Sequence, residues 1–310
     1  MATARVILET PVGSVTLAIV LSLISLVFFD LMGLFIKGLS EDYTAAELSA
    51  YRNIFGLIPS IIALGSSRAW HRSGGKLRVR QWGLICGRGL FVTFAQLMFY
   101  LSLGLMAFAT ATTISYSSGL FMTAFAVVLL GERVGVVRWF AVLIGFAGVV
   151  LVMGPGREAF TLVSFLPLGA AALYALTGVT ARLIDEDVPS ALINLYSSGF
   201  AVLGSVVVAL FFGGFSTIQS ASDFGWIVAM GGFGGIAVLL LIISFRMTDQ
   251  SNLAAFSYFG IPMAFFFGWL FFDEAPVQDL FPGSILIVGG GVLIVLRERR
   301  RRKLALEALR

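Results

Sequence analysis

Long apolar blocks alternate with short polar segments along almost the whole chain. Each block is about 17–24 residues long, the length that a helix rising ~1.5 Å per residue needs to cross ~30 Å of hydrocarbon. The pattern therefore predicts ten transmembrane helices, near residues 15–37, 45–65, 82–103, 109–130, 136–154, 162–183, 190–213, 223–245, 252–272 and 279–297.

Two stretches that lie 142 positions apart repeat the same order of residues. YSSGLFMTAFAVVLLGERV begins at Tyr116 and YFGIPMAFFFGWLFFDEAP begins at Tyr258, and FAGVVLV at 146–152 matches VGGGVLI at 288–294. Because each half holds five predicted helices, an odd number, the second half would cross the bilayer in the opposite sense to the first. Chance similarity between apolar helices is the alternative explanation.

The predicted fold class is an all-α integral membrane protein whose ten transmembrane helices form two inverted five-helix repeats. The expected organisation is a cytoplasmic N-terminus (1–14), a first repeat (15–154), an external linker (155–161), a second repeat (162–297) and a basic cytoplasmic tail (298–310).

The sidedness follows from the Lys and Arg residues, most of which fall on one side of the predicted helices. They concentrate in SSRAWHRSGGKLRVR, in GERVGVVR and in the tail RERRRRKLALEALR. Since positively charged loops resist translocation, we expect a multi-pass protein of the cell (inner) membrane with both termini in the cytoplasm. The lipid bilayer then accounts for the net charge of +4, and no nucleic-acid partner is expected.

Composition narrows the possible chemistry further. With 58% hydrophobic and 12% charged residues, the chain is too apolar for an ordinary soluble domain. The single Cys86 and the single His71 exclude a disulfide framework and a His/Cys metal cluster, so neither a metal nor a cofactor is expected. The glycines of GRG at 87–89 and of GPG at 154–156 lack the spacing of a dinucleotide site. GGFGG at 231–235 and GGG at 289–291 indicate helices that approach closely.

A central chamber is predicted around the two repeated tyrosines. Pro262 cannot donate a backbone hydrogen bond and should free the carbonyl of Tyr258, and freed backbone at membrane depth usually lines a cavity. Substrate contact and ordinary hydrogen bonding between helices both stay open as roles for Tyr116 and Tyr258. The candidate substrate-binding residues are Tyr258, Tyr116, Arg88, Gln96, Tyr100, Thr112, Asn252, Tyr174 and Asn194.

Charged residues inside the predicted helices are expected to have a structural or coupling role, because an unpaired ion in hydrocarbon is costly. Asp30 and Arg52 lie at similar depths, which predicts an ion pair or a water-bridged pair, and Asp30 could also carry a coupling proton. Lys37 and Glu47 are expected to pair at the rim. Arg88 could reach the lipid headgroups or point inward to hold an anionic group.

The same segments resemble a known family. FFDLMGLFIKGLSEDYTAAELSAYRNIFGLIP, CGRGLF, LLGERVGVVRWFAVLIGFAGVVLV and AAFSYFGIPMAFFFGWLFFDE are similar to the drug/metabolite transporter superfamily, and within it to the EamA-type ten-helix transporters. The resemblance covers residues 15–297. More narrowly, the sequence is similar to a bacterial branch with proposed S-adenosylmethionine and riboflavin carriers, and to eukaryotic solute carriers of the same superfamily. It implies transport, and it places Leu120 where the family usually has a Pro.

The sequence therefore predicts a secondary active transporter, which moves a small organic metabolite across the cytoplasmic membrane by alternating access. The cargo is expected to be amphiphilic and to bear an aromatic ring or a carboxylate. Protons are a candidate coupling ion, and the protein is expected to be a monomer or a homodimer. An integral-membrane enzyme or a non-transporting receptor is the alternative, although no catalytic set of nucleophile, base and orienting residue is found.

Overall fold

The computed structural model describes most of the chain, and every segment assigned to an element in it is helical. The described residues are 12–66, 71, 80–131, 136–153, 162–180, 183–184, 190–247, 256, 258–274, 277–290, 292–293, 296 and 300. Within them, seven helical stretches are long and apolar enough to cross a membrane, and the apolar segments Trp139–Val152 and Gly260–Phe272 are shorter.

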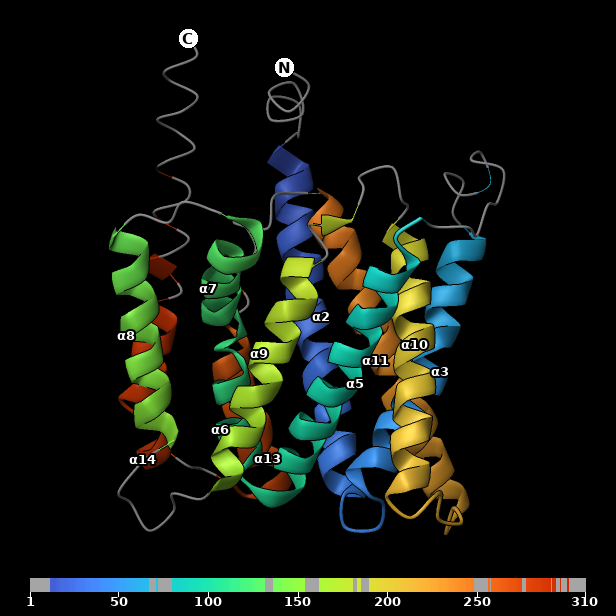
Figure 1. The fold of residues 1–310 in the computed structure, drawn as a ribbon. Coiled ribbons are helices and arrows are strands. Elements are labelled where there is room, and N and C mark those ends of the chain that lie inside the picture. Colours follow the sequence, from blue (N-terminus) through green and yellow to red (C-terminus); the bar gives the residue numbers. More distant parts are fainter. Residues whose placement is uncertain are drawn as a thin grey trace.

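The helices lie side by side in one bundle (Figure 1). Their bounds are α2 (Val12–Leu39), α3 (Ala45–Gly65), α5 (Trp82–Leu105), α6 (Phe108–Ser115), α7 (Ser118–Leu130), α8 (Val136–Met153), the 3-10 turn η1 (Leu162–Ser164), α9 (Phe165–Thr180), α10 (Ser190–Phe211), α11 (Ala221–Met247), α13 (Gly260–Phe272) and α14 (Val277–Leu280). Residues 283–290 are also helical. Every predicted span overlaps one of these helices.

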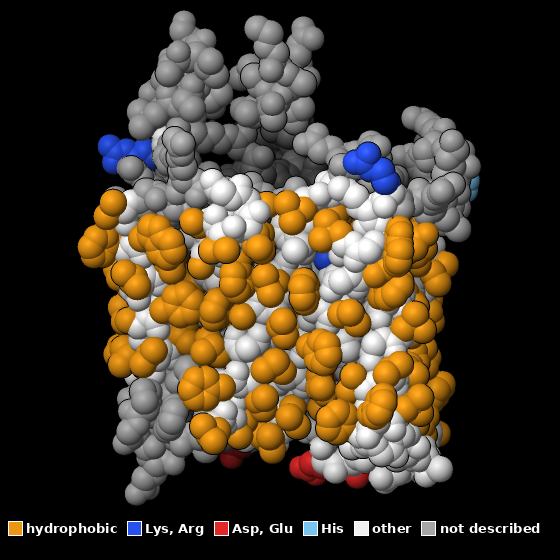
Figure 2. Space-filling view, viewed as in Figure 1, with side chains coloured by type: hydrophobic (Ala, Val, Ile, Leu, Met, Phe, Trp, Pro, Cys, Tyr) orange, Lys and Arg blue, Asp and Glu red, His pale blue; other side chains and the backbone are white. Residues whose placement is uncertain are grey.

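The outer surface of the bundle is apolar over most of its height. Figure 2 shows a broad band of hydrophobic side chains on one face, with basic side chains at one end and acidic side chains at the other. Large apolar side chains are exposed on this surface, for example Val128 at 78% and Phe211 at 84% exposure. A soluble protein rarely exposes so large a continuous apolar area, and the band therefore marks the surface that contacts lipid.

Helix packing brings the two halves of the chain together. α11 packs along α2 and α3, α5 packs along α9 and α10, and α7 lies against α9. The largest buried cluster includes Met32, Ile36, Tyr100, Phe108 and Ile227, which come from α2, α5, α6 and α11. Segments distant in sequence thus share one interior.

α7 and α13 are built alike. Each has 13 residues and follows a two-residue turn, formed by Tyr116 and Ser117 before α7 and by Tyr258 and Phe259 before α13. Each ends at a left-handed residue, Gly131 with φ 65° or Asp273 with φ 53°. The fourth predicted span is thus broken into α6 and α7 even though Leu120 replaces the usual Pro.

The carbonyl of Tyr258 differs from the expectation. Pro262 cannot donate to it, but the backbone N–H of Ile261 does so at 3.1 Å, in a tighter turn than an α-helix makes. The predicted free carbonyl is therefore wrong, although the break in the helix is present.

Close glycine contacts hold α8 against the helix at 283–290. A side-chain carbon on Gly148 would lie 2.6 Å from the carbonyl oxygen of Gly283, and one on Gly290 would lie 2.9 Å from the Cα of Gly145. We call this the four-glycine contact. In the same way, Gly231 and Gly235 let α11 approach the backbone of α3. Close approach therefore explains glycines in both clusters that the sequence singled out.

Candidate functional site: a polar chamber inside the bundle

The two repeated tyrosines pack against each other's helices. The hydroxyl of Tyr116 occupies the space where Gly260 would carry a side chain, at the start of α13. A side-chain carbon on Gly119, in the first turn of α7, would lie 3.2 Å from the hydroxyl oxygen of Tyr258. The structure thus brings Tyr116 and Tyr258 together at the two broken helices.

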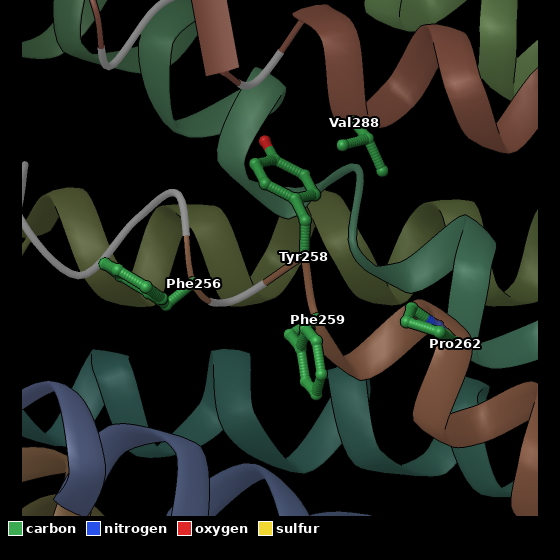
Figure 3. A pocket seen from close by; sticks show the side chains of 5 residues that line it. All are labelled: Phe256, Tyr258, Phe259, Pro262 and Val288. Atoms are coloured by element: carbon green, nitrogen blue, oxygen red, sulfur yellow. The ribbon is translucent and has the colours of Figure 1, made fainter.

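A pocket of about 300 Å³ lies beside Tyr258. It is lined by Phe256, Tyr258, Phe259, Pro262 and Val288. Figure 3 shows the rings of Tyr258 and Phe259 pointing to opposite sides of the chain, with Pro262 one turn further along α13. The wall is mostly aromatic and apolar, and the Tyr258 hydroxyl is its only polar side-chain group among these lining residues.

Buried polar atoms without a hydrogen-bond partner gather in the bundle interior. Within the described part of the chain they are Asp30 Oδ2, Arg52 Nε, Arg88 Nε and Nη1, Tyr100 Oη, Ser117 Oγ and the Oγ1 atoms of Thr110, Thr112 and Thr113. Folded proteins satisfy most buried polar groups, so a concentration of unsatisfied ones needs a specific explanation. They come from α2, α3, α5, α6 and the turn after α6, and we call the buried polar region that they form the chamber.

Asp30 and Arg52 do not form the predicted ion pair. The guanidinium of Arg52 donates from Nη1 to Asn53 Oδ1 at 3.0 Å and from Nη2 to the carbonyl oxygen of Gly234 at 3.3 Å. Gly234 lies on α11, and its missing side chain leaves room for the guanidinium. The pairing was inferred from depth alone, and depth does not report which neighbouring helix a long side chain faces.

Three further candidates, all tyrosines, lie near Asp30 or Arg52. Tyr100 on α5 and Tyr174 on α9 both lie within electrostatic range of Arg52. Tyr116 lies within electrostatic range of Asp30. Arg52 and Tyr174 come from α3 and α9, which are not among the helix pairs that pack most closely. Arg88, on α5, is partly buried and forms no salt bridge within the described residues.

Gln96 and Asn194 join helices by hydrogen bonds. Gln96 Oε1 accepts from Ser49 Oγ at 3.2 Å and from Asn53 Nδ2 at 2.7 Å. Asn194 Nδ2 donates to Ser60 Oγ at 3.0 Å. Sequence reasoning missed Asn53, which also donates to Ser205 at 3.3 Å, although an amide beside Arg52 within an apolar span was a visible signal. Asn252 lies outside the described residues.

Replacing Asn53 with Leu should destabilise the protein by about 2 kcal/mol, because buried Arg52 Nη1 loses its described acceptor and Gln96 loses the shorter of its two described hydrogen bonds. The change removes the acceptor of Arg52 Nη1 and a donor to Gln96. Thermal unfolding of the purified protein in detergent measures the loss. Asn194→Leu is the matched control, since it removes only one described bond, and an equal loss in both variants would contradict this role for Asn53.

Lys37 pairs with Glu274 rather than with Glu47. Lys37 Nζ lies 2.9 Å from Glu274 Oε1 and donates to the carbonyl oxygens of Leu103 and Met106, at 3.2 and 2.8 Å. Glu274 Oε2 accepts the backbone N–H of Phe108, the first residue of α6, at 2.8 Å. These contacts, the Lys37 network, connect α2, the α5–α6 turn, α6 and the end of α13 at one end of the bundle.

Glu47 binds Thr44 and Ser216 instead of Lys37, so the predicted pair of Lys37 with Glu47 is wrong. Its Oε2 accepts from the backbone and hydroxyl of Thr44, at 2.8 Å each, and completes the capping box that begins α3. Its Oε1 accepts from Ser216 in the segment between α10 and α11. A Thr three residues before a Glu is a capping signature that sequence alone could have revealed.

An apolar belt, a helical bundle and a polar interior define a polytopic helical membrane protein. The sequence pattern of the EamA-like transporter family matches residues 16–154 and 161–296, and the chain therefore belongs to this family. The family lies within the drug/metabolite transporter superfamily, and its members are transporters rather than enzymes.

Curated relatives carry transporter names. The chain is 23% identical to an S-adenosylmethionine uptake transporter of Rickettsia bellii, over 90% of this chain and 92% of that protein. It is 27% identical to a riboflavin transporter of Brucella anthropi over 58% of this chain, and the match spans 64% of that relative. It is 24% identical to human solute carrier family 35 member G1, over 89% and 78% of the two chains.

The fold matches a solved structure as well. One crystal structure superimposes with a TM-score of 0.62 at 20% identity, over 91% of this chain and 98% of the other. This likeness establishes a shared fold.

Proposed function

We propose that the protein is a secondary transporter, which moves a small organic metabolite across the cytoplasmic membrane by alternating access. The observation that carries the proposal is the group of unpartnered buried polar atoms on α2, α3, α5, α6 and the turn that separates α6 from α7. A pathway for a polar solute needs such groups, because hydrocarbon offers no hydrogen bonds and each unsatisfied group is costly there.

Alternating access requires two halves that can move about a shared site, and an inverted repeat supplies them. The likeness of α7 and α13 supports two inverted five-helix repeats at residues 15–154 and 162–297. Packing supports them too. In the proposed repeats α2 corresponds to α9, α5 to α11 and α7 to α13. The contact between α2 and α11 then corresponds to the contact between α9 and α5. The contact between α13 and α2 likewise corresponds to the contact between α7 and α9. Both termini are proposed to lie in the cytoplasm, from the distribution of Lys and Arg.

The broken helices suggest where the movement acts. α7 and α13 each begin beside one of the two tyrosines, so a tilt of either helix changes the walls of the chamber. At one end of the bundle the Lys37 network ties α2 and α6 to the end of α13. We propose that this end faces outward and is closed here, and that opening it breaks the network.

Exchange by the purified protein in liposomes tests the proposal. S-adenosylmethionine and riboflavin, the cargoes named for the relatives, serve as labelled probes for counterflow. Tyr258→Phe and Arg88→Ala should each lower the initial rate about tenfold, which corresponds to ~1.4 kcal/mol of lost interaction with the cargo. Both variants should unfold at the wild-type temperature.

Tyr51→Phe is the matched control, because the Tyr51 ring packs against Phe215, 5.4 Å away, at the end of the bundle. It should transport at the wild-type rate. Wild-type kinetics in both chamber variants would exclude the chamber as the binding site. A folded protein that exchanges neither probe, nor any of a wider panel of metabolites, would contradict the transport proposal itself.

A further inference from the structure

The chamber includes one acidic and one basic side chain that do not pair with each other in the described structure. Asp30 is 3% exposed and Arg52 is 9% exposed, and neither forms a salt bridge within the described part of the chain. We propose that the cargo is a zwitterion, with a cationic group that binds Asp30 and an anionic group that binds Arg52. This inference rests on the proposed function and assigns the substrate class of the same chamber.

The carboxylate of Asp30 is available to a cationic or strongly donating group. Its Oδ2 is buried and has no hydrogen-bond partner, and the neighbouring Tyr116 lies on the turn between α6 and α7. A carboxylate has acceptor capacity for about four hydrogen bonds, so an unpartnered buried oxygen marks unused capacity. An ammonium group offers three donors and the opposite charge, and it would satisfy this oxygen.

The guanidinium of Arg52 has hydrogen-bonding capacity that its described contacts do not fill. Its described contacts are with the side-chain oxygen of Asn53 and the carbonyl oxygen of Gly234, which are both uncharged, and its Nε has no partner. These contacts orient the guanidinium without neutralising it. A carboxylate is the group that a guanidinium binds best, because two parallel hydrogen bonds add to the charge attraction.

A zwitterion fits this pair of groups better than other cargoes do. A neutral cargo would offer neither Asp30 nor Arg52 a group of opposite charge, and a cargo with one charge would offer it to only one of them. The proposed cargo neutralises both at once. Arg88, also without a described salt bridge, is left for a second anionic group of the cargo.

Binding of matched probes tests the charge assignment. The first set is phenylalanine, 2-phenylethylamine and 3-phenylpropanoate, which share a ring and carry both charges, only the positive charge or only the negative charge. S-adenosylmethionine, which bears an amino-acid group, and riboflavin, which bears neither charge, form the second set. The shift in unfolding temperature of detergent-purified protein across a concentration series gives the affinity of each probe.

In at least one set the wild-type protein should bind the zwitterion at least about tenfold more tightly than the other probes of that set. The zwitterion is phenylalanine in the first set and S-adenosylmethionine in the second. Asp30→Asn should remove the advantage of phenylalanine over 3-phenylpropanoate, and Arg52→Gln should remove its advantage over 2-phenylethylamine. Asp42→Asn and Arg300→Gln, which make the same changes at exposed positions, should keep the wild-type preference. The two variants should thus lose discrimination against different probes, one anionic and one cationic. A general loss of folding cannot produce this difference.

Two results would overturn the inference while leaving transport intact. The first is riboflavin or a singly charged probe that is bound and exchanged at least as well as any zwitterion. The second is a zwitterion that Asp30→Asn and Arg52→Gln bind with unchanged affinity. In either case counterflow in liposomes still shows exchange, whereas failure of the proposed function appears as a folded protein that exchanges no probe.

Discussion

Gly148→Val is expected to reduce the free energy of unfolding by about 3 kcal/mol, at the upper end of the range for overpacking. A side-chain carbon at this position would meet the carbonyl oxygen of Gly283 at 2.6 Å and the backbone nitrogen of Ile287 at 2.8 Å. Both are backbone atoms of a helix, so neither can turn aside as a side chain could. The two helices would have to separate.

Thermal unfolding in detergent measures this loss, and Gly283→Val should be as severe, because the contact is reciprocal. Gly289→Val is the matched control, since no atom lies within 4 Å of the position of its added carbon. It should cost little beyond the helix propensity of Val. An unfolding temperature for Gly148→Val equal to that of Gly289→Val would show that these helices do not meet as described.

Glu274→Gln is expected to open the end of the bundle at the Lys37 network, the end that we propose is closed and faces outward. The change removes the counter-ion of Lys37, whose side chain is only 13% exposed, and weakens the cap on the N–H of Phe108. Breaking a buried ion pair by removing one partner costs about 3–5 kcal/mol, and this partly exposed pair should lie at or below the lower figure. We expect the loss to fall mainly on the closed state.

Cysteine labelling measures this opening. In a chain whose one natural cysteine is changed, Cys86→Ala, a cysteine at Thr112 reports access to the chamber. A membrane-impermeant thiol reagent on the outer side should react at least tenfold faster when Glu274→Gln is added. Asp273→Asn makes the same change in charge one residue away, at an exposed position, and should leave the rate unchanged.

The double exchange Lys37→Glu with Glu274→Lys should not restore the closed state. Lys37 also donates to two carbonyl oxygens, and Glu274 also accepts a backbone N–H. With the charges exchanged, the new carboxylate would face carbonyl oxygens and the new ammonium would face a donor. Full restoration of slow labelling would contradict this account and would reduce the network to a simple ion pair.

The transmembrane helices could be predicted from sequence because the bilayer dictates their apolar length. α3 begins and ends where the hydropathy places it, at Ala45 and Gly65. The break between α6 and α7 was harder to predict, since Ser117, Ser118 and Gly119 can serve either a bend or close packing.

The partners of charged side chains could not be predicted in the same way. Lys37 pairs with a residue 237 positions later in the chain, and Arg52 contacts a carbonyl on α11. Such contacts depend on which helices become neighbours, whereas the hydropathy of a span reports only its depth. The capping of α3 by Glu47 is local and was within reach of the sequence, as a Thr three residues before a Glu.

The four-glycine contact has a mechanical consequence. Backbones that touch through Gly145, Gly148, Gly283 and Gly290 have almost no compressible layer of side chains between them. α8 and the helix at 283–290 should therefore be stiff relative to each other and move as one body. Any rocking movement of the bundle would then occur at other helix interfaces, where longer side chains separate the backbones. The other helices would tilt relative to this rigid pair.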